Sequence, residues 1–193
     1  MRIILFISFL FLNLGCATTY HLELAPKVEQ LNSFRLDSTS PPGQTNYLER
    51  EDKGNGWSIG LIETTKYFFA KFNYSQVNYT QIDSNGFGTF EVENNYANVD
   101  LALGVNLAFL KPYLVSSSRL IQGGDEPDRF AGAGLRVEIP FTENTKISID
   151  YSNKTRIYED SSRAGPEDEL QALYIGFMFG NWQTGNTNKR NKP

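Results

Sequence analysis

The chain has 193 residues, of which 40% are hydrophobic, 13% aromatic and 21% charged. A mean hydropathy of −0.39 excludes a polytopic helical membrane protein, and the aromatic content argues against disorder. The net charge of −4 argues against a nucleic-acid partner, because phosphate binding needs a basic face. With one Cys and one His, no internal disulfide can form and little remains for metal or triad chemistry, so we expect no cofactor and no metal site.

The N-terminal residues have the pattern of a bacterial signal peptide. Arg2 supplies a positive charge, and residues 3–12 form an apolar run that is too short to span a bilayer. The following Asn13-Leu14-Gly15-Cys16 resembles a lipobox. We therefore predict a lipoprotein-type signal peptide over residues 1–15 and lipidation of Cys16. The alternative is an ordinary secretory signal in which Cys16 is incidental.

The rest of the chain alternates between apolar and polar residues with a period of two, which is the signature of β-strands. The pattern is clearest where Val99, Leu101, Leu103 and Val105 alternate with polar or small residues. The first segment is the poorest, because Pro26 interrupts it. In chain order, we expect strands within residues 22–38, 57–61, 66–74, 98–106, 113–121, 130–139, 145–157 and 170–179.

The connections between these segments alternate between long and short. The long ones fall at residues 39–55, 81–86, 122–129 and 158–168, and the short ones between them are only a few residues long. This rhythm is typical of an up-and-down barrel of the outer membrane, with long extracellular loops and short periplasmic turns. We therefore divide the chain into a leader with the first strand at residues 16–38, the remaining barrel at residues 39–180, and a polar, disordered tail at residues 181–193.

Three stretches resemble the small outer-membrane barrels of the opacity protein and OmpX-like superfamily. They are residues 102–106 through 110–114, residues 132–135 through 145–151, and the final residues 174–179. The resemblance implies an all-β fold, an eight-stranded antiparallel up-and-down transmembrane β-barrel. It also implies a location in the bacterial outer membrane, with outer-membrane lipid and the barrel-assembly machinery as partners.

Alternation alone does not decide which face of the strands is wet. In a membrane barrel the apolar residues face lipid, whereas in a soluble barrel they line the core. We favour the membrane orientation, in which the mid-strand charges of Lys71, Asp100, Arg136, Glu138, Lys146 and Asp150 pair in the lumen. The residues then predicted to face lipid are Trp57, Phe72, Leu101, Leu103, Val105, Leu135, Val137, Ile147, Ile149, Tyr151, Ile175, Phe177 and Phe179.

No catalytic constellation emerges from the sequence. His21, the single imidazole, lies close to Cys16 and far from the expected extracellular rim, so we predict no enzymatic activity. The acidic loops are the remaining candidates for contact with an unidentified surface ligand. Their residues are Asp125, Glu126, Asp128, Glu159, Asp160, Glu167 and Asp168.

Two hypotheses for the function follow. The first is a non-enzymatic outer-membrane barrel with a structural or surface-interaction role. The second is a soluble, lipid-anchored periplasmic barrel that binds an apolar ligand in its core. The position of Phe72, Leu103, Ile149 and Ile175 separates them, because these side chains face lipid in the first case and a cavity in the second.

Overall fold

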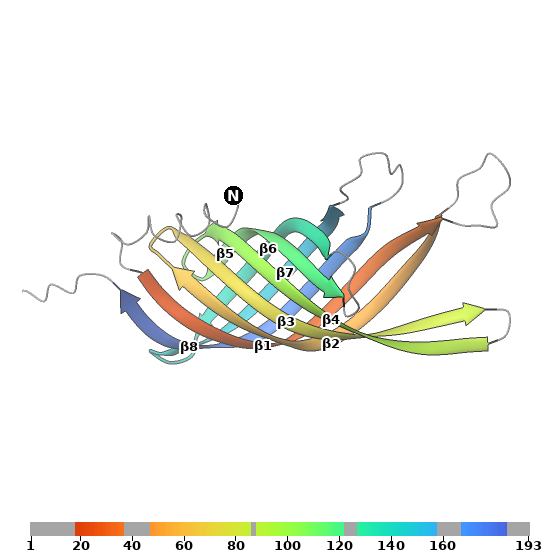
Figure 1. Cartoon of the computed structure of the whole chain (residues 1–193). Coiled ribbons are helices and arrows are strands. Elements are labelled where there is room, and N and C mark those ends of the chain that lie inside the picture. The colour runs from red at the N-terminus through yellow and green to blue at the C-terminus, as the bar shows by residue number, and fades with distance from the viewer. Residues whose placement is uncertain (1–17, 37–46, 86–87, 122–126, 158–166, 185–193) are drawn as a thin grey trace, which may run out of the picture.

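A computed structural model of the chain describes residues 18–36, 47–85, 88–121, 127–157 and 167–184. Eight antiparallel strands close into a single barrel in sequence order, with β1 hydrogen-bonded to β8 (Figure 1). The predicted fold class is therefore confirmed. The strands are β1 (Thr18–Leu36), β2 (Tyr47–Thr64), β3 (Phe68–Asn85), β4 (Gly88–Val105), β5 (Leu110–Ile121), β6 (Asp128–Pro140), β7 (Thr145–Ile157) and β8 (Glu169–Thr184).

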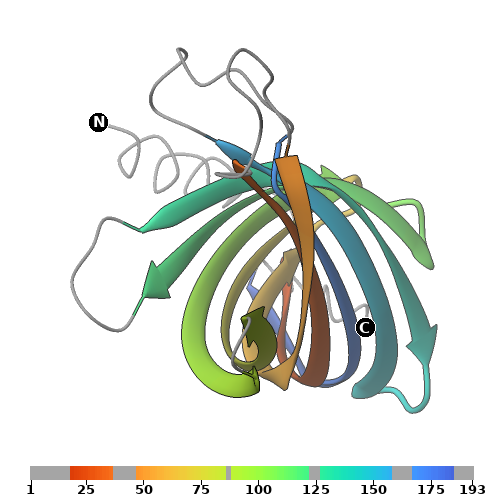
Figure 2. The same ribbon diagram turned by 90° about the vertical axis from the view of Figure 1, so that its right-hand side faces the viewer.

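The two ends of the barrel differ in their connections. β1 begins and β8 ends at the same end as the short connections at residues 65–67, 106–109 and 141–144, which we call the turn end (Figure 1). The four remaining connections lie at the opposite end, which we call the loop end. Viewed from the loop end, the strands form a closed ring (Figure 2).

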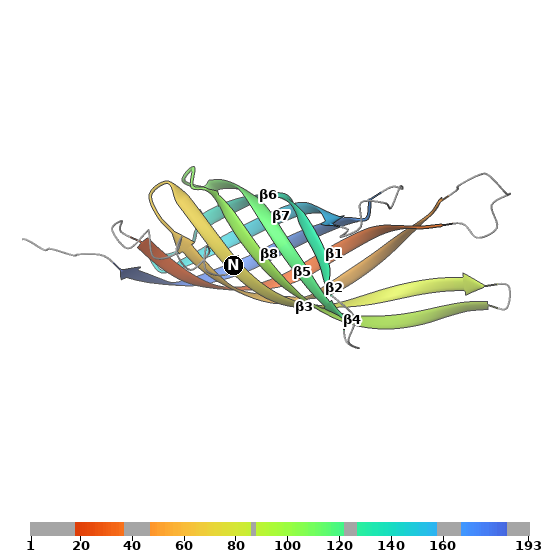
Figure 3. The ribbon, with the colours of Figure 1, turned by 45° about the horizontal axis from the view of Figure 1, so that its top comes forward.

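β2, β3 and β4 extend further toward the loop end than the sequence pattern predicts. β2 begins at Tyr47, inside the connection expected at residues 39–55, and β3 pairs with β4 as far as Asn85↔Gly88, across the expected loop at residues 81–86. In these extensions the apolar alternation is weak or absent from the sequence, although the ladder pairing continues. The β1–β2 and β3–β4 hairpins consequently project beyond the ring at the loop end (Figure 3).

Pro26 does not interrupt β1. The ladder between β1 and β2 runs through it without a break, and Pro26 pairs with Trp57. The ladder between β1 and β8 has no pair at Pro26, since it passes from Leu24↔Phe177 directly to Lys27↔Tyr174. The backbone nitrogen of Pro26, which carries no hydrogen, therefore faces β8. One continuous neighbour is enough to hold the strand.

Two predicted segments fall largely outside the described residues. The signal peptide with Cys16 is one of them, so lipidation stays a prediction. The polar tail, predicted at residues 181–193, is the other. Its first residues are described, because β8 continues to Thr184. None of the described residues belongs to a helix that is long and apolar enough to cross a membrane.

Candidate functional site: a charged lumen and an apolar outer belt

The outer surface of the barrel is apolar around its middle. The structure places all thirteen residues predicted to face lipid on this surface, and Phe72, Ile175 and Phe177 are about half exposed. Leu101, Val137 and Ile147 on the same face are partly covered by their neighbours. The four residues that distinguish a membrane barrel from a soluble barrel with an apolar core lie on the outer surface and do not line the interior. They are Phe72, Leu103, Ile149 and Ile175.

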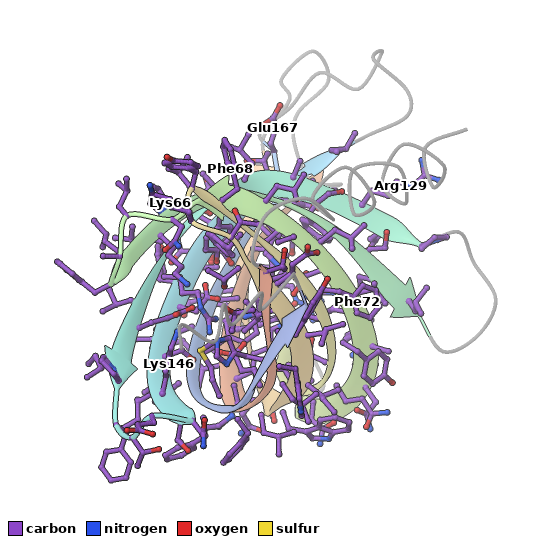
Figure 4. All side chains as sticks on the ribbon, turned by 90° about the vertical axis from the view of Figure 1, so that its left-hand side faces the viewer. Lys66, Phe68, Phe72, Arg129, Lys146 and Glu167 are labelled. Carbon is purple, nitrogen blue, oxygen red and sulfur yellow. The ribbon has the colours of Figure 1, made fainter. Side chains whose placement is uncertain are left out.

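The interior holds charged side chains instead. Alternation directs them inward from β1 and from β3 to β7, because the neighbours of each outward apolar residue point to the other face. Figure 4 shows the inside of the ring crowded with side chains that carry nitrogen and oxygen. The fully buried ionisable residues include Glu23, Lys27, Glu29, Lys71, Asp100, Lys111, Arg119, Arg136, Glu138, Asp150 and Lys154.

Arg136 organises the half of the lumen nearer the turn end. Its guanidinium donates to Glu23 at 2.7 Å, to Glu138 at 2.9 Å and to Asp150 at 3.1 Å. Lys71 from β3 lies 2.8 Å from both Glu23 and Asp150. Four strands, β1, β3, β6 and β7, are thereby joined across the lumen by one ion-pair network, which we call the turn-side network.

Glu138 extends the turn-side network to the mouth of the barrel. Its Oε2 lies 2.8 Å from Lys111 Nζ and 3.2 Å from Lys146 Nζ, and the Lys146 side chain is partly exposed there. Glu23, Glu138 and Asp150, the carboxylates of this network, therefore each have at least two cationic partners. That is the condition under which buried charge is tolerated, since an unpaired ion would cost several kcal/mol.

Asp100 and Glu29 organise the other half, which we call the loop-side network. Asp100 accepts from Lys154 at 3.0 Å, from the Tyr174 hydroxyl at 2.8 Å and from Ser117. Because Lys27 contacts Glu29 and lies 4.0 Å from Asp100, it joins the two carboxylates.

Arg119 closes the loop-side network against aromatic rings. It donates to the Tyr79 hydroxyl at 2.6 Å, and that hydroxyl in turn donates to Glu29 at 2.5 Å. The guanidinium carbon lies 4.9 Å from the ring centroids of Tyr79 and Tyr96 and 5.5 Å from that of Phe130. Arginine suits this place, because its flat, weakly hydrated cation stacks on rings while it forms hydrogen bonds in its plane.

Only a small space separates the two networks. A cavity of about 10 Å³ lies between Lys71 and Asp150 on one side and Asp100, Lys154 and Tyr174 on the other. That is about the room of a single water molecule. At this level the described side chains leave no room for a solute larger than water, which fits the narrow interior of an eight-stranded barrel.

The acidic residues predicted to contact a ligand are differently placed. Asp128 and Asp168 both pair with Arg156, the second at 3.1 Å, and Asp168 also accepts from the backbone N–H of Phe34 at 3.0 Å. They tie β1, β6, β7 and β8 together at the loop end, whereas Glu167 is exposed. The remaining four lie outside the described residues. They are Asp125, Glu126, Glu159 and Asp160.

His21 lies at the turn end, where its Nδ1 contacts the carbonyl oxygen of Gly180. It is buried near the start of β1, the part of that strand farthest from the loop end. Among the described residues, no group of three His, Cys, Asp or Glu side chains is arranged to hold a metal ion.

Sequence reasoning found part of this lumen. It predicted inward charges at Lys71, Asp100, Arg136, Glu138, Lys146 and Asp150, and the structure confirms them. It missed the charged residues of β1 and β5, namely Glu23, Lys27, Glu29, Lys111 and Arg119. The sequence of β1 did carry a signal for its charges, because Leu22, Leu24, Pro26 and Val28 alternate with residues that include Glu23, Lys27 and Glu29. Sequence reasoning overlooked the alternation because Pro26 predicts an interruption of the strand.

The orientation of the two faces decides the environment of the barrel. A closed antiparallel barrel with an apolar outer belt and a charged, filled interior is built for a hydrocarbon surround, because closure gives every strand a hydrogen-bonded neighbour on both sides. The barrel spans the bacterial outer membrane. Its short connections identify the turn end as periplasmic and the loop end as extracellular.

Comparisons with known proteins leave the family open. No family model matches the chain, and no curated protein matches it. OprG from Pseudomonas aeruginosa is 9% identical and covers 89% of this chain and 98% of its own, with a TM-score of 0.49. AlkL, solved in lipid bilayers, is 10% identical and covers 91% of this chain and 95% of its own, with a TM-score of 0.49. Ail from Yersinia pestis is 9% identical and covers 86% of this chain and 98% of its own, with a TM-score of 0.44.

Proposed function

We propose that this protein is a non-enzymatic outer-membrane barrel that acts through its extracellular side, as a surface-interaction or structural component of the envelope. The observation that carries the proposal is the filled lumen. Since ion-paired side chains occupy it and leave a cavity of about 10 Å³, passage of solutes through the barrel is not its role.

The shape of the loop end supports the same proposal. The paired strands of β1–β2 and β3–β4 continue well above the apolar belt, as far as Leu36↔Tyr47 and Asn85↔Gly88. Extended, hydrogen-bonded hairpins give an outward surface that is held in place by a rigid barrel, which is where binding residues concentrate.

Two further partners belong to the proposal. Cys16 would carry a lipid that anchors the N-terminus in the inner leaflet of the same membrane, close to the turn end. The final strand β8, with Phe177 and Phe179 on its outer face, would be read by the barrel-assembly machinery. The partner at the cell surface is an unidentified ligand.

Electrical recording tests the filled lumen. The purified barrel would be inserted into planar lipid bilayers and its conductance measured in 1 M KCl, beside a large general porin as the positive control. We expect no steady conductance above the bare bilayer. A stable open level for the unmodified protein would overturn the proposal, because it would mean that the ion-pair networks part and solutes pass.

Adhesion tests the role of the extracellular side. Cells that display the protein would be compared with cells that display a variant whose two hairpins end at the belt, on surfaces coated with extracellular-matrix proteins or purified glycans. We expect the shortened variant to lose attachment to at least one surface while remaining at equal abundance in the outer membrane. Equal attachment of both strains to every surface would contradict the interaction role.

A further inference from the structure

β2 and β3 separate above the membrane belt. Their ladder ends at Lys53↔Thr80, whereas β2 continues with β1 and β3 continues with β4. The two hairpins diverge from this point in both side views (Figures 1 and 3). Above Lys53, the edge of β2 therefore faces a fork and not a neighbouring strand.

Two glycines permit a close approach just before the strands part. A Cβ atom on Gly56 would lie 1.8 Å from the carbonyl oxygen of Gln76, and one on Gly54 would lie 2.7 Å from Val77. Only glycine allows β2 to press so tightly on β3 at these positions. The strands are thus pinched below the fork and open above it.

A groove of about 600 Å³ lies at this fork. Its lining comes from one residue of β1, Val28, from the stretch Arg50 to Asn55 of β2, and from Thr80 of β3. Such a volume falls within the range of small-molecule sites. The groove belongs to neither ion-pair network of the lumen.

The position of the groove identifies its surroundings. Trp57 is the next outward residue of β2 after Asn55, on the membrane side of the groove, and it contacts Tyr74 of the neighbouring strand β3. The two ring centroids lie 6.0 Å apart in an edge-to-face contact. Tryptophan and tyrosine gather at the boundary between hydrocarbon and headgroups. Val28, 57% exposed, continues the apolar surface into the groove. The groove therefore opens sideways at the level of the outer-leaflet headgroups.

The charges around the groove cancel. Arg50 pairs with Asp52 at 2.8 Å and Lys53 pairs with Glu51 at 2.7 Å, so the four ions sum to zero. What remains for a ligand is neutral hydrogen-bonding chemistry from the exposed side chains of Asn55 and Thr80, beside the apolar Val28. A hydroxyl-rich ligand with an apolar tail fits this combination better than an ion does.

We propose that this groove holds the saccharide headgroup of an outer-leaflet glycolipid, with Asn55 and Thr80 on the sugar and Val28 and Trp57 along the first part of an acyl chain. The partner is a membrane lipid of defined chemistry. The inference is independent of the surface role proposed above, because it concerns the lipid that surrounds the barrel.

The test is a titration of the full-length protein in phosphatidylcholine nanodiscs with a purified neutral glycolipid, a monoglycosyl diacylglycerol. Chemical shifts of the amides of Gly54, Asn55 and Thr80 would be followed by NMR, and the double variant Asn55→Ala/Thr80→Ala would be compared with Asn153→Ala, another exposed amide on the outer face of β7. We expect saturable shifts at the groove and at least tenfold weaker binding for the double variant only.

Three outcomes would overturn the proposal. Equal shifts with phosphatidylglycerol would mean that the sugar is not recognised and any added lipid suffices. Equal affinity for the free sugar would assign the groove to a soluble glycan and not to a membrane lipid. Equal weakening by Asn153→Ala would mean that the headgroups contact the whole rim without a preferred site.

Discussion

Arg136 illustrates at the scale of single residues how this barrel tolerates charge in its centre. The guanidinium has no exposed surface and contacts three carboxylates from three strands. Its burial is costly, and the hydrogen bonds to Glu23, Glu138 and Asp150 offset that cost only as long as the set is complete. The lumen is therefore sensitive to the loss of any one member.

We expect Arg136→Met to lower the free energy of unfolding by about 3–5 kcal/mol, because three carboxylates would lose their shared cation. The measurement is urea unfolding of the refolded barrel in lipid vesicles. The control is Lys53→Met, whose exposed pair with Glu51 contributes little. Equal stability of the two variants would contradict the account of the lumen.

Gly134 and Tyr113 form a second critical contact inside the lumen. The Tyr113 ring lies over Gly134, and its hydroxyl donates to Asp150 of the turn-side network. A Cβ atom at Gly134 would lie 2.2 Å from the ring. The glycine is therefore needed for space and not for an unusual backbone angle.

We expect Gly134→Val to destabilise the barrel by about 1–3 kcal/mol, since the ring must move and its bond to Asp150 is lost. The same unfolding measurement applies. Ala133→Val is the matched control, because Ala133 lies next to it on the exposed outer face. If both substitutions had the same effect, crowding against Tyr113 would not be the reason for this glycine.

At the scale of elements, the sequence predicts strands well where one face meets lipid and the other meets the lumen. β6 and β7 were predicted almost to the residue, at 130–139 and 145–157 against Asp128–Pro140 and Thr145–Ile157. The first half of β2 was not, because Tyr47 to Lys53 is a mostly charged stretch without apolar alternation. There, only the ladder with β1 defines the strand.

The projecting part of the β3–β4 hairpin makes no ladder with other strands. β2 stops pairing with β3 at Thr80, and β5 pairs with β4 only from Tyr96 onward. We therefore expect replacement of residues 82–91 by Asn-Gly, a favoured two-residue turn, to change the free energy of unfolding by less than about 1 kcal/mol.

The readout for this hairpin is the mobility difference between boiled and unboiled samples on SDS gels, followed by urea unfolding. A control deletion would remove the two membrane-level pairs Lys71↔Ala102 and Asn73↔Asp100 with the residues between them. It should abolish the mobility difference. Loss of the difference in the hairpin variant as well would show that the extension is needed for folding.

At the scale of the whole molecule, sequence alternation described two faces without saying which one is inside. The same pattern suits a soluble barrel with an apolar core and a membrane barrel with a polar core. The structure resolves this because the buried side chains include Arg136 and Glu23, whereas Phe177 and Ile175 are exposed. The proposed lipid anchor, surface ligand and glycolipid site rest on other observations, because neither alternation nor turn length encodes them.

The most direct test of the central claim is site-directed spin labelling in lipid vesicles. In a Cys16→Ser background, a nitroxide would be placed in turn at Phe72, Leu103, Ile149 and Ile175, and at Lys53 as an extracellular reference. We predict that the four barrel positions are accessible to oxygen, which dissolves in hydrocarbon, and protected from a water-soluble nickel chelate, whereas position 53 is accessible to nickel. Nickel access at the four positions, or protection there from both reagents, would contradict a membrane-spanning barrel.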